Sequence, residues 1–199
     1  LAAVNAGRQD FIYGSGVILG SSNFFDGLTF DAGRLRVQPR SNITLDLLSG
    51  NYATPFSGGI KGNLSGAYLT YNPADDSSIE GYVFRDLGAE EHRTGEHLDI
   101  LGLRSTSAIG IYGVEYEAVL QSGKAFNPET GEFERIRAAG GHVDLTGQFR
   151  LFGRDNAIFI QIDRAYQLAE ESKKFSDVPP MGFGRGDVSA VLIQVGNSA

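Results

Sequence analysis

The chain has 199 residues, with 27 glycines, no cysteine, no tryptophan and a formal net charge of −7. This length is enough for one domain with a sizeable core, or for part of a larger one. The missing cysteines exclude disulfides and cysteine-ligated metal sites, and the acidic balance argues against a protein that binds nucleic acid by neutralising its phosphates. We therefore expect a single domain over residues 1–199 without a nucleic-acid partner.

Polar and apolar residues alternate through most of the chain, which predicts β-strands whose two faces differ. The clearest alternation runs over Ile111–Gln121, where Tyr116 and Leu120 share one face and Glu115 and Glu117 share the other. In chain order we expect strands over Gly7–Gly16, Phe25–Asp31, Asn42–Leu48, Gly66–Tyr71, Ile79–Leu87, Leu98–Ser105, Ile111–Gln121, Ile136–Leu151, Ile158–Asp163 and Asp187–Val195. Short strands joined mostly as antiparallel neighbours predict an all-β protein.

The alternation does not say which face of each strand is buried. In Ile79–Leu87, for example, Tyr82 and Phe84 compete with Ile79 and Val83 for the apolar side. The orientation of this strand stays open at the level of sequence.

A soluble β-sandwich and a transmembrane β-barrel both alternate in this way, and two features favour the barrel. Charged residues stand in mid-strand, which suits a water-filled lumen; they are Asp46, Glu115, Glu117, Asp144 and Asp163. Tyrosines stand near strand ends, where an interfacial girdle is found in membrane barrels; they are Tyr71, Tyr112 and Tyr166. The pattern alone leaves both architectures open.

Several short segments occur in a characteristic order along the chain. They are Gly7-Arg8-Gln9-Asp10, Tyr13-Gly14-Ser15-Gly16, Phe25-Asp26-Gly27-Leu28, Leu101-Gly102-Leu103-Arg104, Tyr116-Glu117-Ala118, Gln121-Ser122-Gly123-Lys124 and Ile136-Arg137-Ala138. In this order they resemble the alginate-export family of bacterial outer-membrane β-barrel proteins. The resemblance covers roughly Ala6 to Ile162, and it corresponds to about half of the family domain.

The resemblance implies antiparallel transmembrane β-barrel strands, about nine to ten here, that form part of a larger porin-like barrel. The implied function is a channel in the bacterial outer membrane that passes an alginate-like polysaccharide or other polar solutes through a charged lumen. Its partners would be outer-membrane lipid, the solute and periplasmic export proteins. The competing hypothesis is a soluble β-sandwich that binds carbohydrate by stacking tyrosines on sugar rings.

The lumen of such a barrel would be lined by charged side chains. The candidates for pore lining or substrate contact are Arg8, Asp31, Arg34, Asp46, Arg85, Arg104, Glu115, Glu117, Asp144 and Asp163, with Arg36 as a further cation. Guanidinium groups pair with the carboxylates of a uronic-acid polymer, although each arginine could instead brace the wall through an ion pair. The residues expected to face lipid at the start of the chain are Phe11, Tyr13, Leu28 and Phe30.

Two groups of residues resemble a catalytic or metal-binding site, but neither pattern is specific for one. Glu115 and Glu117 would stand about 6.6–7 Å apart along a strand, which suits an inverting glycosidase, but lumen-facing carboxylates are ordinary in barrels. His92 and His97 lie in a charged segment without the spacing of metal ligands, and weak binding of divalent cations near lipopolysaccharide is the alternative. We therefore predict no catalytic residue, no metal site, no cofactor and no enzymatic activity.

Overall fold

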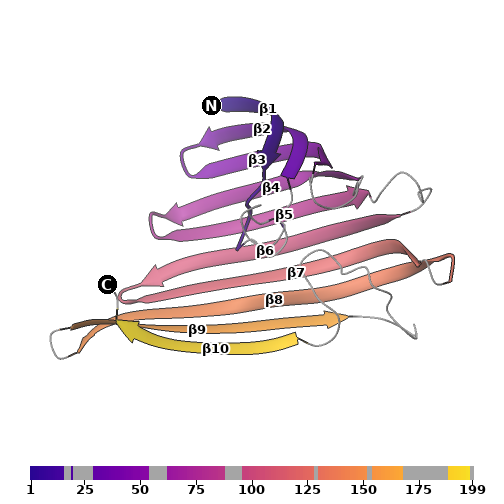
Figure 1. Cartoon of the computed structure of the whole chain (residues 1–199). Helices are drawn as coiled ribbons and strands as arrows, with labels where there is room; N and C mark the ends of the chain where they lie inside the picture. The colour runs from indigo at the N-terminus through magenta and orange to yellow at the C-terminus, as the bar shows by residue number, and fades with distance from the viewer. Residues whose placement is uncertain are drawn as a thin grey trace.

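A computed structural model describes residues 1–15, 19, 29–53, 62–87, 96–127, 130–151, 154–167 and 188–197. These residues form one ten-stranded antiparallel sheet, in which every strand pairs with its neighbours in the chain (Figure 1). The strands are β1 (Ala2–Asp10), β2 (Thr29–Arg40), β3 (Ile43–Tyr52), β4 (Asn63–Ala74), β5 (Ser77–Leu87), β6 (His97–Ile109), β7 (Tyr112–Asn127), β8 (Glu132–Leu151), β9 (Arg154–Gln167) and β10 (Val188–Asn197).

The prediction of an all-β antiparallel protein is confirmed, since the described residues contain no helix. It follows that none of them forms a helix long and apolar enough to cross a membrane. The described strands also belong to a single sheet in which β1 and β10 are not paired with each other, so neither the two packed sheets of a sandwich nor a closed barrel is found among them.

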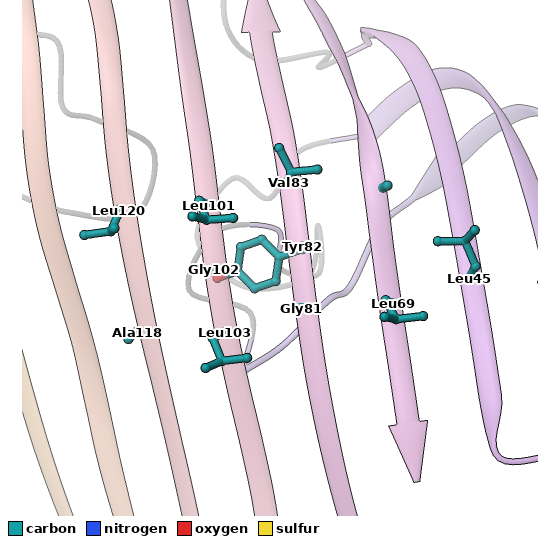
Figure 2. Close-up of a pocket in the computed structure, with 11 residues that line it drawn as sticks. Leu45, Leu69, Gly81, Tyr82, Val83, Leu101, Gly102, Leu103, Ala118 and Leu120 are labelled. Carbon is teal, nitrogen blue, oxygen red and sulfur yellow. The ribbon is translucent and has the colours of Figure 1, made fainter.

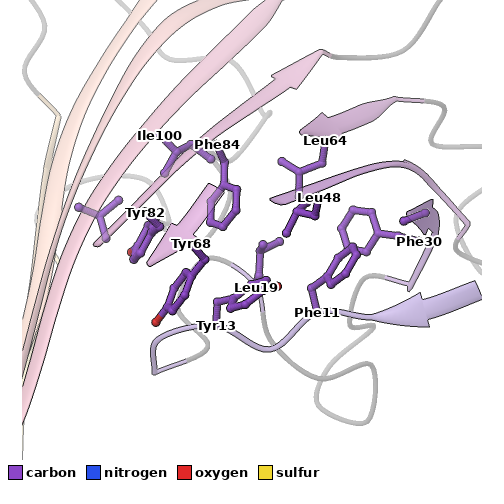
Figure 3. Packing of buried hydrophobic residues seen from close by; sticks show 12 residues of the cluster. Phe11, Tyr13, Leu19, Phe30, Leu48, Leu64, Tyr68, Tyr82, Phe84 and Ile100 are labelled. Atoms are coloured by element: carbon purple, nitrogen blue, oxygen red, sulfur yellow. The ribbon is translucent and has the colours of Figure 1, made fainter. Parts of the chain in front are cut away.

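The sheet has two unlike faces, which we call inner and outer. The inner face carries a cluster of buried apolar side chains, which Figure 3 shows gathered against the sheet. Its members include Phe11, Leu19, Phe30, Leu48, Leu64, Phe84, Ile100 and Val119, together with Tyr13, Tyr68 and Tyr82. The outer face instead exposes a series of leucines and valines, among them Leu47, Val83, Leu101, Leu103 and Leu120.

The first expected strand, Gly7–Gly16, is wrong in its second half. β1 ends at Asp10, and Phe11 and Tyr13 turn onto the inner face, where both are buried. Tyr13 and Leu19 form an isolated antiparallel bridge. We call Phe11–Ser15 together with Leu19 the inner segment. Alternation continues through it, but its apolar side chains pack against the sheet instead of extending it.

The orientation expected at the start of the chain is also wrong. Phe30 is completely buried on the inner face, 5.2 Å from the ring of Phe11 and 5.0 Å from the ring of Tyr52. Phe11 and Tyr13 share that environment, and Leu28 lies outside the described residues. Because successive side chains of a strand point to opposite faces, Asp31 must lie on the outer face.

Candidate functional site

A band of polar side chains crosses the inner face beside the apolar cluster. The strand register places Glu80, Arg104, Glu117 and His142 in one row, and Ser78, Thr106, Glu115 and Asp144 in the next. We call the charged members of these rows the inner polar band. Glu80, Glu117 and His142 are all buried, so their hydrogen-bond partners decide whether the band is stable.

Arg104 lies at the centre of the band and holds two carboxylates. Its Nη1 donates to Oε2 of Glu80 at 2.7 Å, and its Nε donates to Oε1 of Glu115 at 2.8 Å. The imidazole Nε2 of His142 lies 3.4 Å from the same oxygen of Glu115. Arg104 is thus ion-paired within the sheet, as the bracing alternative requires.

Three aromatic side chains with hydroxyl groups form a ladder over the same region. The rings of Tyr13 and Tyr68 stack with centroids 4.3 Å apart, and those of Tyr68 and Tyr82 stack at 5.6 Å. The hydroxyl groups donate to carboxylates as follows: Tyr13 to Asp46 at 2.9 Å, Tyr68 to Glu80, and Tyr82 to Glu117 at 2.5 Å. Each tyrosine therefore donates a hydrogen bond to a buried carboxylate. Without such donors, the burial of these carboxylates would be costly.

The inner segment is tied to this ladder by its backbone. The amide of Gly14 donates to the hydroxyl of Tyr68 at 2.9 Å, and the amide and hydroxyl of Ser15 donate to Oε2 of Glu117 at 3.1 and 2.5 Å. Gly14 has a φ of 62°, a left-handed conformation that favours glycine. A Cβ atom there would also lie 2.6 Å from Oε1 of Glu117. The segment therefore reaches from β1 across the inner face to β7.

Tyr13 is the titratable group of the inner segment, and its surroundings shift its pKa. Burial, followed by the charge of Asp46 and the hydrogen bond to it, raises the pKa of Tyr13 to about 12, while Arg34 acts in the opposite direction. Asp46 also forms an ion pair with Arg36, whose Nε and Nη2 donate to its two oxygens at 2.7 Å each. Asp46 thus joins β2, β3 and the inner segment.

The structure divides the charged residues predicted from the sequence between the two faces. Those on the inner face are Arg34, Arg36, Asp46, Arg104, Glu115, Glu117 and Asp144. Asp163 pairs with His142 in the register of β8 and β9, and its side chain lies outside the described part of the chain.

The other three predicted residues, Arg8, Asp31 and Arg85, lie on the outer face, so the structure does not place them with the rest. Asp31 and Arg85 follow the buried Phe30 and Phe84 in sequence and therefore point the opposite way. Arg8 forms a two-point ion pair with Asp31, both contacts at 2.9 Å, and Arg85 forms one with Asp99 at 2.6 and 2.9 Å. These arginines brace neighbouring strands.

The outer face is apolar over an unbroken row of paired residues. From β2 to β8 the row reads Leu35, Leu47, Ala67, Val83, Leu101, Leu120 and Ala139. A parallel row of polar and small residues borders it and reads Gly33, Ser49, Ser65, Arg85, Asp99, Ser122 and Arg137.

A shallow groove of about 530 Å³ lies on this outer face around Gly81. Figure 2 shows Leu69, Val83, Leu101 and Leu103 around it. The groove is a consequence of small residues at the centre of the apolar rows, where Gly81 leaves space between larger neighbours.

Sequence reasoning missed the tyrosine ladder and His142. Tyr68 and Tyr82 alternate with Leu69 and Val83, so the sequence offers two apolar faces and no means of choosing between them. His142 and Asp144 stand two apart in a strand, which is a signal that they share a face. Their proximity to Glu115 depends on the β7–β8 register, which the sequence does not reveal.

Comparison with known proteins adds no relative: no family model matches the chain, and neither a curated protein nor a solved structure matches it. The resemblance to the alginate-export family therefore stays a prediction.

Proposed function

We propose that the chain forms wall strands of an outer-membrane β-barrel channel of the alginate-export type, which passes an anionic polysaccharide or other polar solutes. The observation that carries this proposal is the unbroken apolar row on the outer face, opposite a band of charged residues on the inner face. A transmembrane barrel has this distribution, with an apolar band toward lipid and a polar interior.

The exposure of the apolar row supports the same proposal. Leu101 is 56% exposed and Leu120 is 53% exposed, and their neighbours across the sheet are also apolar. Soluble monomers rarely expose contiguous apolar patches larger than a few hundred Å². A lipid environment removes the cost of this exposure, because hydrocarbon solvates the leucines and excludes water from them.

The inner face supports passage of solute by weak contacts. Ion pairs such as Arg36–Asp46 are partly exposed, with the arginine side chain 47% exposed. A carboxylate of a passing polymer would exchange with Asp46 for the guanidinium group, and a guanidinium group binds carboxylates through two parallel hydrogen bonds. Many such contacts, none of them tight, would form a path along the wall.

The decisive experiment compares two lysine substitutions on β7. Leu120→Lys places a charge in the apolar row, whereas Ser122→Lys places it in the bordering polar row, two residues away on the same face. We expect Leu120→Lys to destabilise folding into lipid vesicles by about 2–4 kcal/mol, the cost of a lysine near the bilayer midplane. Ser122→Lys should cost much less, and the folded fraction can be measured by resistance to heat in SDS gels.

The same experiment tests the soluble alternative. A chain that remains folded and monomeric without detergent, and that tolerates Leu120→Lys as well as Ser122→Lys, would contradict the barrel and favour the carbohydrate-binding domain. Folding only in detergent or vesicles, with loss for Leu120→Lys alone, would support the barrel.

A further inference from the structure

We propose that Glu115, His142 and Asp144 form a binding site for a divalent transition-metal ion, with zinc as the best chemical match. The three residues lie on the inner face, where β7 pairs with β8. The inference does not depend on the channel, since the site is made by side chains of two adjacent strands.

The geometry brings three suitable ligand atoms together. One ligand atom from each residue lies within 4.8 Å of the other two, so a central point lies about 2.8 Å or less from each atom. Zinc binds imidazole nitrogen and carboxylate oxygen at about 2.0–2.2 Å, so rotations that move each ligand atom by up to about 0.8 Å complete the contacts.

The position of Arg104 is compatible with an ion. Its Nε contacts Oε1 of Glu115, the same oxygen that lies 3.4 Å from His142 Nε2. We assign the other oxygen, Oε2, to the metal. Arg104 then orients Glu115 through its other oxygen, which is the usual role of a residue that orients a metal ligand.

The charge balance of the inner polar band favours a cation. From β5 to β8 its two rows contain the carboxylates of Glu80, Glu115, Glu117 and Asp144 against the single guanidinium of Arg104. Arg104 is shared by Glu80 and Glu115, and the buried Glu117 accepts hydrogen bonds from Tyr82 and Ser15. Carboxylates removed from water are stabilised by a compensating positive charge. Tyrosine hydroxyls satisfy their hydrogen bonds but supply no positive charge. A divalent ion would supply it.

The site also has room for the remaining ligands. A cavity of about 290 Å³ adjoins Glu115 and Asp144 and is lined by further oxygen-bearing side chains, including Asp76, Thr106 and Thr146. A water molecule occupies about 30 Å³ of liquid volume, so several waters fit beside an ion. Three protein ligands with open positions can bind water or a carboxylate from solution. The mixed nitrogen and oxygen set favours zinc and its neighbours over magnesium or calcium.

The test is titration of the folded chain with zinc chloride, followed by calorimetry, against three variants. His142→Ala removes the imidazole, Asp144→Asn keeps the side-chain volume and removes the charge, and His97→Ala removes a histidine from the start of β6 as a matched control. Cobalt(II) in place of zinc gives a visible absorption band that reports coordination by nitrogen and oxygen.

We expect saturable binding of one ion, with the affinity lowered at least about tenfold in His142→Ala and Asp144→Asn and unchanged in His97→Ala. The Asp144→Asn variant keeps the test valid if His142→Ala fails to fold. Absence of saturable binding would overturn the site, and so would equal affinity in the parent and Asp144→Asn. These outcomes are independent of channel activity, so the two proposals can fail separately.

Discussion

Tyr82 lies directly over the backbone of Gly102 on the neighbouring strand. A Cβ atom built on Gly102 would fall 1.9 Å from Cζ of the Tyr82 ring, far inside van der Waals contact. This close approach lets the ring lie flat on β6 while its hydroxyl donates to Glu117 on β7. The absence of a side chain at Gly102 therefore positions a hydrogen bond one strand further on.

We predict that Gly102→Ala lowers the free energy of unfolding by about 1–3 kcal/mol, the usual cost of overpacking a buried site. Gly81 is the matched control, because it pairs with the next residue of β6, Leu103, and an added Cβ would meet no atom within 4 Å. Gly81→Ala should be neutral or slightly stabilising. Denaturant unfolding of both variants checks the prediction, and equal midpoints would contradict it.

At this scale, sequence predicted which residues share a face but not which face is buried. In β7 the glutamates were correctly separated from Tyr116 and Leu120. In β2 the same alternation gave the wrong orientation, because Phe30 is buried by Phe11, a contact between residues far apart in the chain. A period of two is symmetric between the faces, and only tertiary contacts choose between them.

Among the elements, the inner segment is the one that departs from the regular sheet. Its amides and the hydroxyl of Ser15 reach Tyr68 on β4 and Glu117 on β7. Sequence alternation extends through the segment, and for that reason a strand was expected there. Its true path depends on partners tens of residues away, which local pattern does not report.

We predict that Ser15→Ala loosens the inner segment by about 1.5–3 kcal/mol, the net value of a hydrogen bond to a charged group. The amides of Gly14 and Ser15 should then exchange with deuterium at least about tenfold faster than in the parent chain. Ser105→Ala is the control, since it removes a serine hydroxyl that donates at 3.0 Å to the backbone of Ser78, elsewhere in the sheet. Faster exchange at Gly14 in the control as well would point to general destabilisation.

The attachment of the inner segment should also depend on alkaline pH through Tyr13. Because the pKa of Tyr13 is raised from 10.0 to about 12 in the folded chain, its protonated form is stabilised by folding. That contribution is complete below pH 10 and is lost as the pH rises through 12, when a phenolate would face Asp46.

The measurement is the ultraviolet absorbance of ionised tyrosine, recorded as a difference between the parent chain and Tyr13→Phe. The difference should titrate near pH 12, well above an ordinary tyrosine. A difference that titrates near pH 10 would show that Tyr13 is solvated and would contradict its burial.

On the scale of the whole molecule, the ion pairs of the two faces have different roles in the proposed channel. Arg36 and Arg85 each bind an aspartate through two contacts, and their side chains are 47% and 59% exposed. Arg36 lies on the inner face and Arg85 on the outer face. Arg36 and Arg85 are therefore matched in chemistry, but they lie on opposite faces of the sheet.

We predict that Arg36→Gln shifts the ion selectivity of the channel toward cations, because Asp46 keeps its charge after the guanidinium is removed. Arg85→Gln should leave selectivity unchanged. Reversal potentials in planar bilayers under a salt gradient measure the shift. Equal reversal potentials for both variants and the parent would contradict the assignment of the inner face to the lumen.

The overall plan of the sheet was largely predictable from sequence, since strands such as Ile111–Gln121 and Ile136–Leu151 fall within or close to β7 and β8. Turn-forming residues between alternating segments favour neighbouring strands, and the structure has this order throughout. The candidate metal site was not predictable, because Glu115 and Asp144 meet only through the register of two long strands.

The contacts of Ser15 also set the order in which the molecule can assemble. Every strand pair joins neighbours in the chain, so strands can be added to the sheet one after another in chain order. The bond from Ser15 to Glu117 joins residues 102 positions apart, and it cannot form until β7 has taken its place. The ring contacts of Phe11 with Phe30 and of Tyr13 with Tyr68 and Phe84 involve only β2, β4 and β5, so they can form earlier. The inner segment can therefore pack in two steps, with its rings on the first five strands and Ser15 on β7 afterwards.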